Sequence, residues 1–182
     1  IHASFAQAFF AFVAGLALLT SPEWRGEIKE RPIDDGGKLL RLSVIALAMI
    51  YLQVIFGAVL RHTGERLDAH LIFAVLVIVH VVLIVARVMR NHSSHQKLTR
   101  LAGMLAALLG VQLLLGAGSY FGKYTTLLRI PAEGVVYITT IHLAVGALML
   151  VTSLILTLRV LRLSRARELS PAHSILREQP SV

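Results

Sequence analysis

Histidine is the residue type with the clearest chemical potential in this chain of 182 residues. His2, His70 and His142 each stand at or near the start of a long apolar run. A neutral imidazole can bind a metal through one ring nitrogen while the other nitrogen donates a hydrogen bond. The chain has no cysteine, which excludes disulfides, iron–sulfur clusters, thiolate haem ligation and cysteine-based zinc sites. A metal in this protein must therefore rest on histidine or carboxylate.

The elements that carry these histidines are predicted to be membrane helices. The chain is 56% hydrophobic and 15% charged, against about 25% charged residues in water-soluble domains. A helix needs about 20 mostly apolar residues to cross the hydrocarbon layer. We predict an all-α membrane protein with five transmembrane helices, near residues 1–20, 40–62, 67–90, 98–121 and 134–162. The alternative, core helices of a soluble protein, is disfavoured because these runs have no amphipathic face.

The formal net charge of +8 follows an alternating pattern along the chain. The segments after the first, third and fifth predicted helices hold fourteen of the eighteen Lys and Arg residues, and the other two loops hold four. Cytoplasmic loops of membrane proteins are rich in Lys and Arg. We expect an integral protein of a bacterial plasma membrane, with the basic loops and the carboxy terminus in the cytoplasm and no nucleic-acid partner.

A two-helix unit occurs twice in the chain. His70 and His142 are each followed, at the same spacing, by an Arg-x-x-Arg pair, at 87–90 and 159–162. The helices that precede them share the pattern Gln-x-x-x-Gly-Ala. The unit is therefore a hairpin of one outgoing and one returning helix, and repeats of this kind form bundles by stacking like faces. We predict that residues 40–163 form an antiparallel four-helix bundle.

His2 suggests that a third such hairpin is incomplete. The stretch of chain from His2 to His70 is nearly as long as the stretch from His70 to His142. Residues 1–21 would then be the last helix of a truncated amino-terminal half, so we expect the chain to be a fragment, with a processed amino terminus as the alternative. Residues 22–39 would form a cytoplasmic linker and residues 164–182 a cytoplasmic tail.

The repeat indicates what His70 and His142 could do together. Equivalent positions in two hairpins bring them to matching depth on facing helices, although a lone membrane histidine is often a hydrogen-bonded packing residue. With no carboxylate nearby to complete a zinc or di-iron shell, two imidazoles suit a haem, whose porphyrin supplies four of six ligands. Such a haem transfers electrons and has no open position for oxygen. Small residues would leave room for the flat ring: Gly57, Ala58, Gly116, Ala117, Gly118 and Gly146.

The remaining polar residues receive plainer interpretations. Arg61 and Arg129 lie in the predicted outer loops, where they would either pair with haem propionates or be ordinary solvated charges. Gln53 and Gln112 are predicted to hydrogen-bond between helices. His80 is predicted to pack or to form an interhelical hydrogen bond. His92, His95 and His173 are predicted to be solvated.

The stretch LQVIFGAVLRHTG (52–64) resembles the heme A synthase family, and the similarity extends over residues 1–162. Members of that family have eight membrane helices in two pseudo-symmetric halves, each with two histidines. Within the stretch, Arg-His-Thr resembles the family's signature. His70 and His142 match the two ligands of haem b in the carboxy-terminal half. His2 matches a histidine of the amino-terminal half, where the resemblance places the substrate heme O.

The resemblance implies oxidation of the heme O methyl group to the formyl group of heme A, for cytochrome oxidase. Haem b would relay electrons from a donor that the sequence does not identify, and the expected partners are the lipid bilayer, heme O and a second copy of the chain. The family's first three helices, with a histidine and a glutamate, have no counterpart here, so the chain alone should be catalytically incomplete and no catalytic residue is assigned. The alternatives are a b-type electron carrier without chemistry of its own and a cofactor-free membrane scaffold.

Overall fold

The computed structural model describes residues 2–27, 32–33, 35–125 and 129–168, and every element in that part of the chain is a helix. The elements are α1 (His2–Thr20), α2 (Pro22–Arg25), α3 (Gly36–Thr63), α4 (Leu67–Asn91), α5 (Gln96–Tyr124) and α6 (Ala132–Glu168). Helices α3 to α6 are each long and apolar enough to cross a membrane. Helix α1 is apolar but shorter, so length and composition support four of the five predicted membrane helices.

Two helix ends differ from the predicted ones by four residues or more, because the helices continue beyond the apolar runs. α3 begins at Gly36 rather than at residue 40, since the Asp35 carbonyl accepts the first backbone hydrogen bonds of the helix. α6 continues to Glu168, and residues 169–182 of the predicted tail lie outside the described part of the chain. Apolar composition marks what fits in a membrane, whereas backbone hydrogen bonding decides where a helix stops. The segment predicted as linker contains α2 and the first turn of α3.

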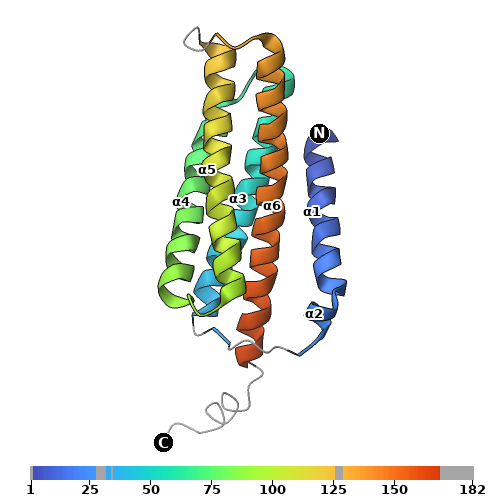
Figure 1. Ribbon diagram of the computed structural model, residues 1–182, viewed down its shortest axis with the longest axis vertical. Helices are drawn as coiled ribbons and strands as arrows, with labels where there is room; N and C mark the ends of the chain where they lie inside the picture. The colour runs from blue at the N-terminus through green and yellow to red at the C-terminus, as the bar shows by residue number, and fades with distance from the viewer. Residues whose placement is uncertain (1, 28–31, 34, 126–128, 169–182) are drawn as a thin grey trace, which may run out of the picture.

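The four long helices lie side by side, and each runs opposite to the next (Figure 1). α3 packs against α4 and α6, and α5 packs against the same two helices, so α4 and α6 stand diagonally opposite each other. The α3–α4 and α5–α6 connections are at one end, here called the connection end; α2 and the α4–α5 connection are at the other. α1 lies outside these four helices, against α6 and α3.

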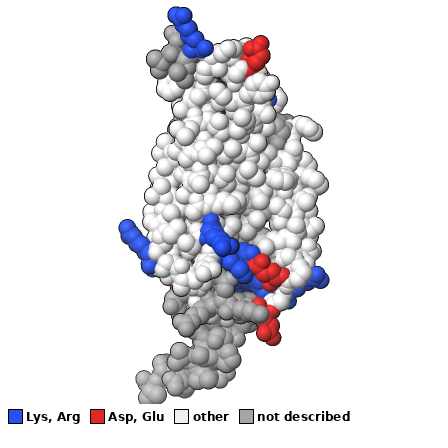
Figure 2. All heavy atoms as spheres, viewed as in Figure 1, with Lys and Arg blue, Asp and Glu red and all other residues white. Residues whose placement is uncertain are grey.

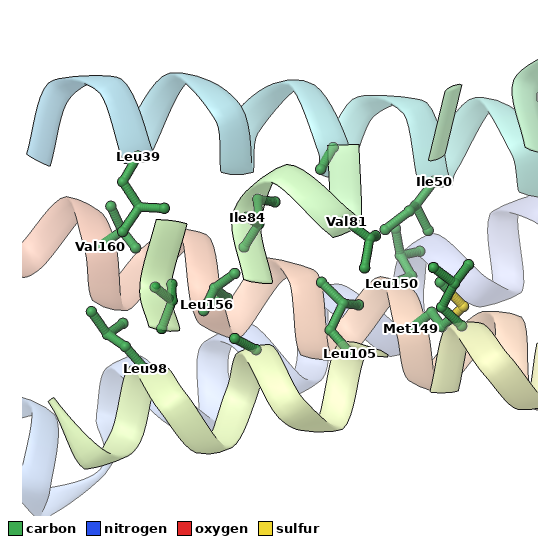
Figure 3. Packing of buried hydrophobic residues seen from close by; sticks show 14 of the residues in the cluster. Leu39, Ile50, Val81, Ile84, Leu98, Leu105, Met149, Leu150, Leu156 and Val160 are labelled. Carbon is green, nitrogen blue, oxygen red and sulfur yellow. The ribbon is translucent and has the colours of Figure 1, made fainter. Parts of the chain in front are cut away.

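The tightly packed core occupies the half of the helices away from the connection end. On α4 and α5 its buried side chains recur three or four residues apart, as expected for a helical face turned inward (Figure 3). On α4 and α5 they are Val77, Val81, Ile84, Val88, Leu98, Ala102, Leu105 and Leu109. Toward the connection end, among the described residues of 51–76 and 110–144, Ala58 is the only buried one. Packing is therefore looser there, where His70 and His142 lie.

Charged side chains gather near the two ends of the molecule, and the band between them is almost free of charge (Figure 2). Large apolar side chains are exposed along this band, including Leu114 at 76% and Phe5 at 71%. Exposed apolar surface of this extent is costly in water and ordinary in lipid. The arrangement is that of an integral membrane protein.

Candidate functional site

His70 and His142 approach each other across the bundle, from the diagonally opposite helices α4 and α6. Their ring centres are 6.4 Å apart and the ring planes make an angle of 66°. His70 lies in the first turn of α4, where its backbone N–H bonds to the Arg66 carbonyl. The two histidines that the repeat made equivalent thus share one place in the structure.

Each ring also contacts the other helix of its own hairpin through the Gln-x-x-x-Gly turn. In the first hairpin, Nε2 of Gln53 lies 3.4 Å from Nε2 of His70. A Cβ atom at Gly57 would lie 3.1 Å from Cε1 of the same ring, which is closer than side chains normally pack. Residues four apart share a helix face, so the amide and the glycine meet the ring together. The glycine allows the imidazole to lie against the backbone of α3.

The second hairpin repeats this arrangement. Nε2 of Gln112 lies 3.3 Å from Nε2 of His142, and a Cβ atom at Gly116 would lie 3.3 Å from Cε1 of that ring. Gly146 adds one contact, because a Cβ atom there would lie 3.3 Å from Nε2 of Gln112. The predicted interhelical hydrogen bonds of the two glutamines are present, and their partners are the two histidines.

The hydrogen bonds leave the site with unused polar groups. Six buried side-chain nitrogen or oxygen atoms have no partner in the described part of the chain, and four of them are here: Nδ1 of both histidines and Oε1 of both glutamines. No hydrogen bond from the described residues reaches Nδ1 of either ring. Buried polar atoms are normally satisfied, so a cluster without partners suggests a place for a bound molecule.

The donor set fits a haem better than a bare metal ion. The described residues contain no group of three or more His, Cys, Asp or Glu side chains that could hold a metal. Two imidazoles cannot complete a zinc site, but they can fill the two axial positions that a porphyrin leaves open. Two metal–nitrogen bonds of about 2 Å, plus about 1 Å from each nitrogen to its ring centre, would place the ring centres about 6 Å apart. The observed ring-centre separation of 6.4 Å is compatible with two imidazoles on one metal, and each Nε2 faces the glutamine of its own hairpin.

The structure does not bring the other predicted site residues to this pair. Arg61, in the last turn of α3, and Arg129, in the α5–α6 connection, are both exposed and have no hydrogen bond or ion pair with the residues described. They are at the connection end, on the same side of the core as the histidines. His2 is exposed at the start of α1, which contacts neither α4 nor α5.

For two further histidines the structure shows contacts that the sequence did not specify. Nδ1 of His80 donates to the Leu76 carbonyl at 2.8 Å, which is a bond within α4 rather than between helices. The prediction that His92 is solvated is wrong, because it is buried and its Nε2 donates to Oδ1 of Asp35 at 2.5 Å. His95 stacks edge to face on the His92 ring, whereas His173 lies outside the described residues.

Sequence reasoning missed the carboxylates that bind the repeated arginines. Asp35 accepts hydrogen bonds from Arg87, Asn91 and His92. Burial acts to raise the pKa of the Asp35 carboxyl, but the hydrogen bonds from Arg87 and Asn91 and the nearby positive charges outweigh it and hold that pKa below its usual value. The matching positions of Arg87 and Arg159 in the repeat were the available signal.

Glu23 plays the corresponding part for the second hairpin. Its Oε1 lies 2.8 Å from Nη1 of Arg159 and 2.9 Å from Nζ of Lys97. The hydrogen bonds from Arg159 and Lys97 lower the pKa of the Glu23 carboxyl to about 2. The segment between α1 and α3 is therefore attached to both hairpins, away from the histidine pair.

The chain matches no protein-family model, no curated protein and no solved structure.

Proposed function

We propose that this chain is the haem-binding part of a heme A synthase-like membrane protein. His70 and His142 would hold one haem b, which would supply one-electron transfer in a protein whose reaction is the oxidation of the heme O methyl group to a formyl group. α1 crosses the membrane in addition to α3 to α6 and belongs to the amino-terminal half, which binds the substrate heme O. His2 is a ligand of that substrate. The end that carries α2 and the α4–α5 connection faces the cytoplasm, in keeping with its share of the basic residues.

The observation that carries the proposal is the equivalent placement of the two rings. Each ring comes from the returning helix of a repeated hairpin and contacts the glutamine and the glycine of its own hairpin, at equivalent positions. The two ring centres are 6.4 Å apart. A packing histidine needs no counterpart in the other repeat. The looser packing near the connection end, where Ala58 alone is buried among the described residues of 51–76 and 110–144, supports the same interpretation.

The residues of the chain would hold and insulate the cofactor. A haem with two histidine ligands supplies one-electron transfer when bound. The imidazoles fix its position between α4 and α6, and the glycines at 57 and 116 let the rings lie against α3 and α5. The apolar walls of the helices keep water away, which favours electron transfer over side reactions. Arg61 and Arg129 are the candidates for contact with the propionates, since arginine suits carboxylates.

The test of the haem is the absorption and electron paramagnetic resonance spectrum of the purified protein. We expect a six-coordinate, low-spin haem b. His70→Ala and His142→Ala should each abolish that signal, whereas His80→Ala, which changes a histidine of the same helix as His70, should keep it. A protein without haem, or a low-spin signal that survives His70→Ala, would show that the proposal is wrong.

The catalytic part of the proposal is tested separately from the haem. The protein is expressed from its whole gene in a cell that makes heme O but no heme A, and the haems are extracted and identified by mass. New heme A supports the enzyme. A low-spin haem b without heme A instead supports the b-type electron carrier, which would use the same histidine pair.

A further inference from the structure

The repeat also contains a pattern of basic residues, at the end of the bundle opposite the connection end. Each outgoing helix begins with Lys-x-x-Arg, at 38–41 on α3 and 97–100 on α5, and the lysine precedes the repeated glutamine by fifteen residues in both. Each returning helix carries Arg-x-x-Arg at the same end, at 87–90 on α4 and 159–162 on α6. Each hairpin therefore has four basic residues at equivalent positions, two on each helix.

In the second hairpin these residues hold a carboxylate. Oε1 of Glu23 lies 2.9 Å from Nζ of Lys97 and 2.8 Å from Nη1 of Arg159. Arg162 donates to the backbone carbonyls of Glu23 and Gly26, at 3.2 and 2.6 Å. A lysine and an arginine from two neighbouring helices thus share one oxygen of an anion. The repeated basic residues are able to form an anion site, and Glu23 fills it in this hairpin.

The equivalent residues of the first hairpin are mostly unused. Arg87 donates to Asp35 at 2.6 Å, so this carboxylate is already paired. Lys38, Arg41 and Arg90 are exposed and have no hydrogen bond or ion pair with the residues that the structure describes. We call these three residues the open basic site. Two of them are the equivalents of residues that hold α2 in the second hairpin.

The contacts of Asp35 show that the open basic site is one place rather than two. Arg87 and Asn91, on either side of Arg90 in α4, both donate to Oδ2 of Asp35. Asp35 precedes Lys38 by three residues, which is about one helical turn. The last turn of α4 and the first turns of α3 therefore lie together, and one anion can contact cations of both helices.

Exposed apolar side chains continue from the open basic site toward the connection end. Val44 is three residues from Arg41, and Leu83 is seven residues from Arg90; both are exposed. Residues three and seven apart share a helix face, so each cation stands at the end of an apolar strip. The site is thus at the edge of the band that faces lipid (Figure 2). A phospholipid, with an anionic head and apolar chains, matches both parts, whereas a soluble anion matches only the basic part.

We propose that the two hairpins carry equivalent anion sites, that the open basic site binds the headgroup of an anionic phospholipid, and that Glu23 occupies the corresponding site of the second hairpin. Charge complementarity identifies the occupant, because Lys and Arg beside a membrane surface attract anionic lipids and arginine suits phosphate. The proposal does not depend on haem, since none of these residues contacts the histidine pair.

The first test measures lipid binding to the purified, delipidated protein in detergent by native mass spectrometry. Phosphatidylglycerol is compared with phosphatidylcholine of the same acyl chains, and we expect phosphatidylglycerol to bind more tightly. Arg41→Gln combined with Arg90→Gln should weaken its binding about 25-fold, or about fivefold for each arginine. The matched control combines Arg66→Gln with Lys123→Gln, which are exposed cations near the connection end, and should leave binding unchanged.

Three results of this test would overturn the lipid site. They are equal binding of the two lipids, equal affinity of the Arg41→Gln, Arg90→Gln variant and the wild-type protein, and displacement of phosphatidylglycerol by inorganic phosphate. The last would assign the open basic site to soluble anions. Circular dichroism checks that both double variants stay helical.

The second test examines the equivalence of the two hairpins. Glu23→Gln keeps the shape of the side chain and removes the anion that lies between Lys97 and Arg159. We expect this variant to retain one more phosphatidylglycerol molecule than the wild-type protein. Glu27→Gln, which changes an exposed acid of the same segment, is the control and should retain the wild-type number. Equal numbers in the two variants would refute the idea that Glu23 occupies a lipid-type site.

Discussion

Arg87 donates from Nε to Oδ2 of Asp35 at 2.6 Å, which ties the last part of α4 to the residue that precedes α3. The equivalent arginine of the second hairpin, Arg159, binds Glu23 of α2 at 2.8 Å. The repeated arginines therefore have a common use, because each anchors the segment between α1 and α3 to its own hairpin. The histidine pair lies on the other side of the apolar core. Substitutions in the pairs Arg87–Asp35 and Arg159–Glu23 therefore do not touch the proposed haem site.

Asp35→Asn should destabilise the protein by about 1–3 kcal/mol, the cost of leaving a partly buried charged donor without its partner. The Arg87 side chain is 25% exposed and the His92 side chain only 5%, so water replaces the carboxylate poorly. The measurement is the free energy of unfolding in detergent. Glu23→Gln is the matched control: its carboxylate is 50% exposed, and such pairs contribute about 0–1 kcal/mol. Equal effects of the two variants would contradict the prediction.

Acid should weaken the contact of α2 with the bundle. The pKa of Glu23 is lowered from 4.5 to about 2, so its contribution to the docked state is complete above pH 4.5 and is lost as the pH falls toward 2. Trp24 is the only tryptophan of the chain and packs 4.9 Å from the Arg162 guanidinium, so its fluorescence reports the docking of α2. We expect a fluorescence change between pH 4.5 and 2 that Glu23→Gln removes. A wild-type signal that is constant over this range would refute it.

Leucine truncation should distinguish the packed core from the membrane-facing surface. Leu156 is fully buried and Leu114 is 76% exposed. Leu156→Ala leaves a cavity between helices and should cost about 2–5 kcal/mol, whereas Leu114→Ala should change stability by about 0.5 kcal/mol or less. Unfolding in detergent or lipid measures both variants. A large loss for Leu114→Ala would indicate that another protein segment, rather than lipid, covers this face.

The two exposed arginines of the connection end should influence the haem electrostatically. If Arg61 and Arg129 contact the propionates, their replacement by glutamine removes positive charge that favours the reduced haem, and the reduction potential should fall in both variants. Lys38→Gln, at the opposite end in the first turn of α3, is the control and should leave the potential unchanged. Equal potentials in all three variants would assign both arginines to ordinary solvated charge.

Several features could be predicted from the sequence because they depend on local composition. Uncharged runs of about 20 residues identify α3 to α6, since only a helix satisfies its own backbone in lipid. The spacing of Gln, Gly, His and Arg revealed the hairpin repeat. The repeat in turn identified His70 and His142 as equivalent, which required no knowledge of how the helices are rotated.

Other features depend on how each helix is rotated about its axis and on where it ends, and the sequence gives little information on either. When a helix is apolar on all sides, its composition does not indicate which face points into the bundle. The contact of Gly57 with the His70 ring therefore could not be predicted from the sequence, because it depends on how α3 packs against α4. The prediction that His92 is solvated fails for a related reason. Its burial depends on Asp35, far earlier in the chain, which only the packing of α3 against α4 brings to it.

The sequence by itself thus determined which four segments form helices long and apolar enough to cross a membrane and which histidines are equivalent, because both follow from patterns along one chain. Only the tertiary structure decided that the His70 and His142 rings come within 6.4 Å, that a glutamine meets Nε2 of each, and that carboxylates before α3 anchor the repeated arginines. These contacts join residues far apart in sequence. Their geometry depends on how the side chains of apolar helices pack together and on a few polar contacts between helices. The hydropathy of the sequence does not predict this packing.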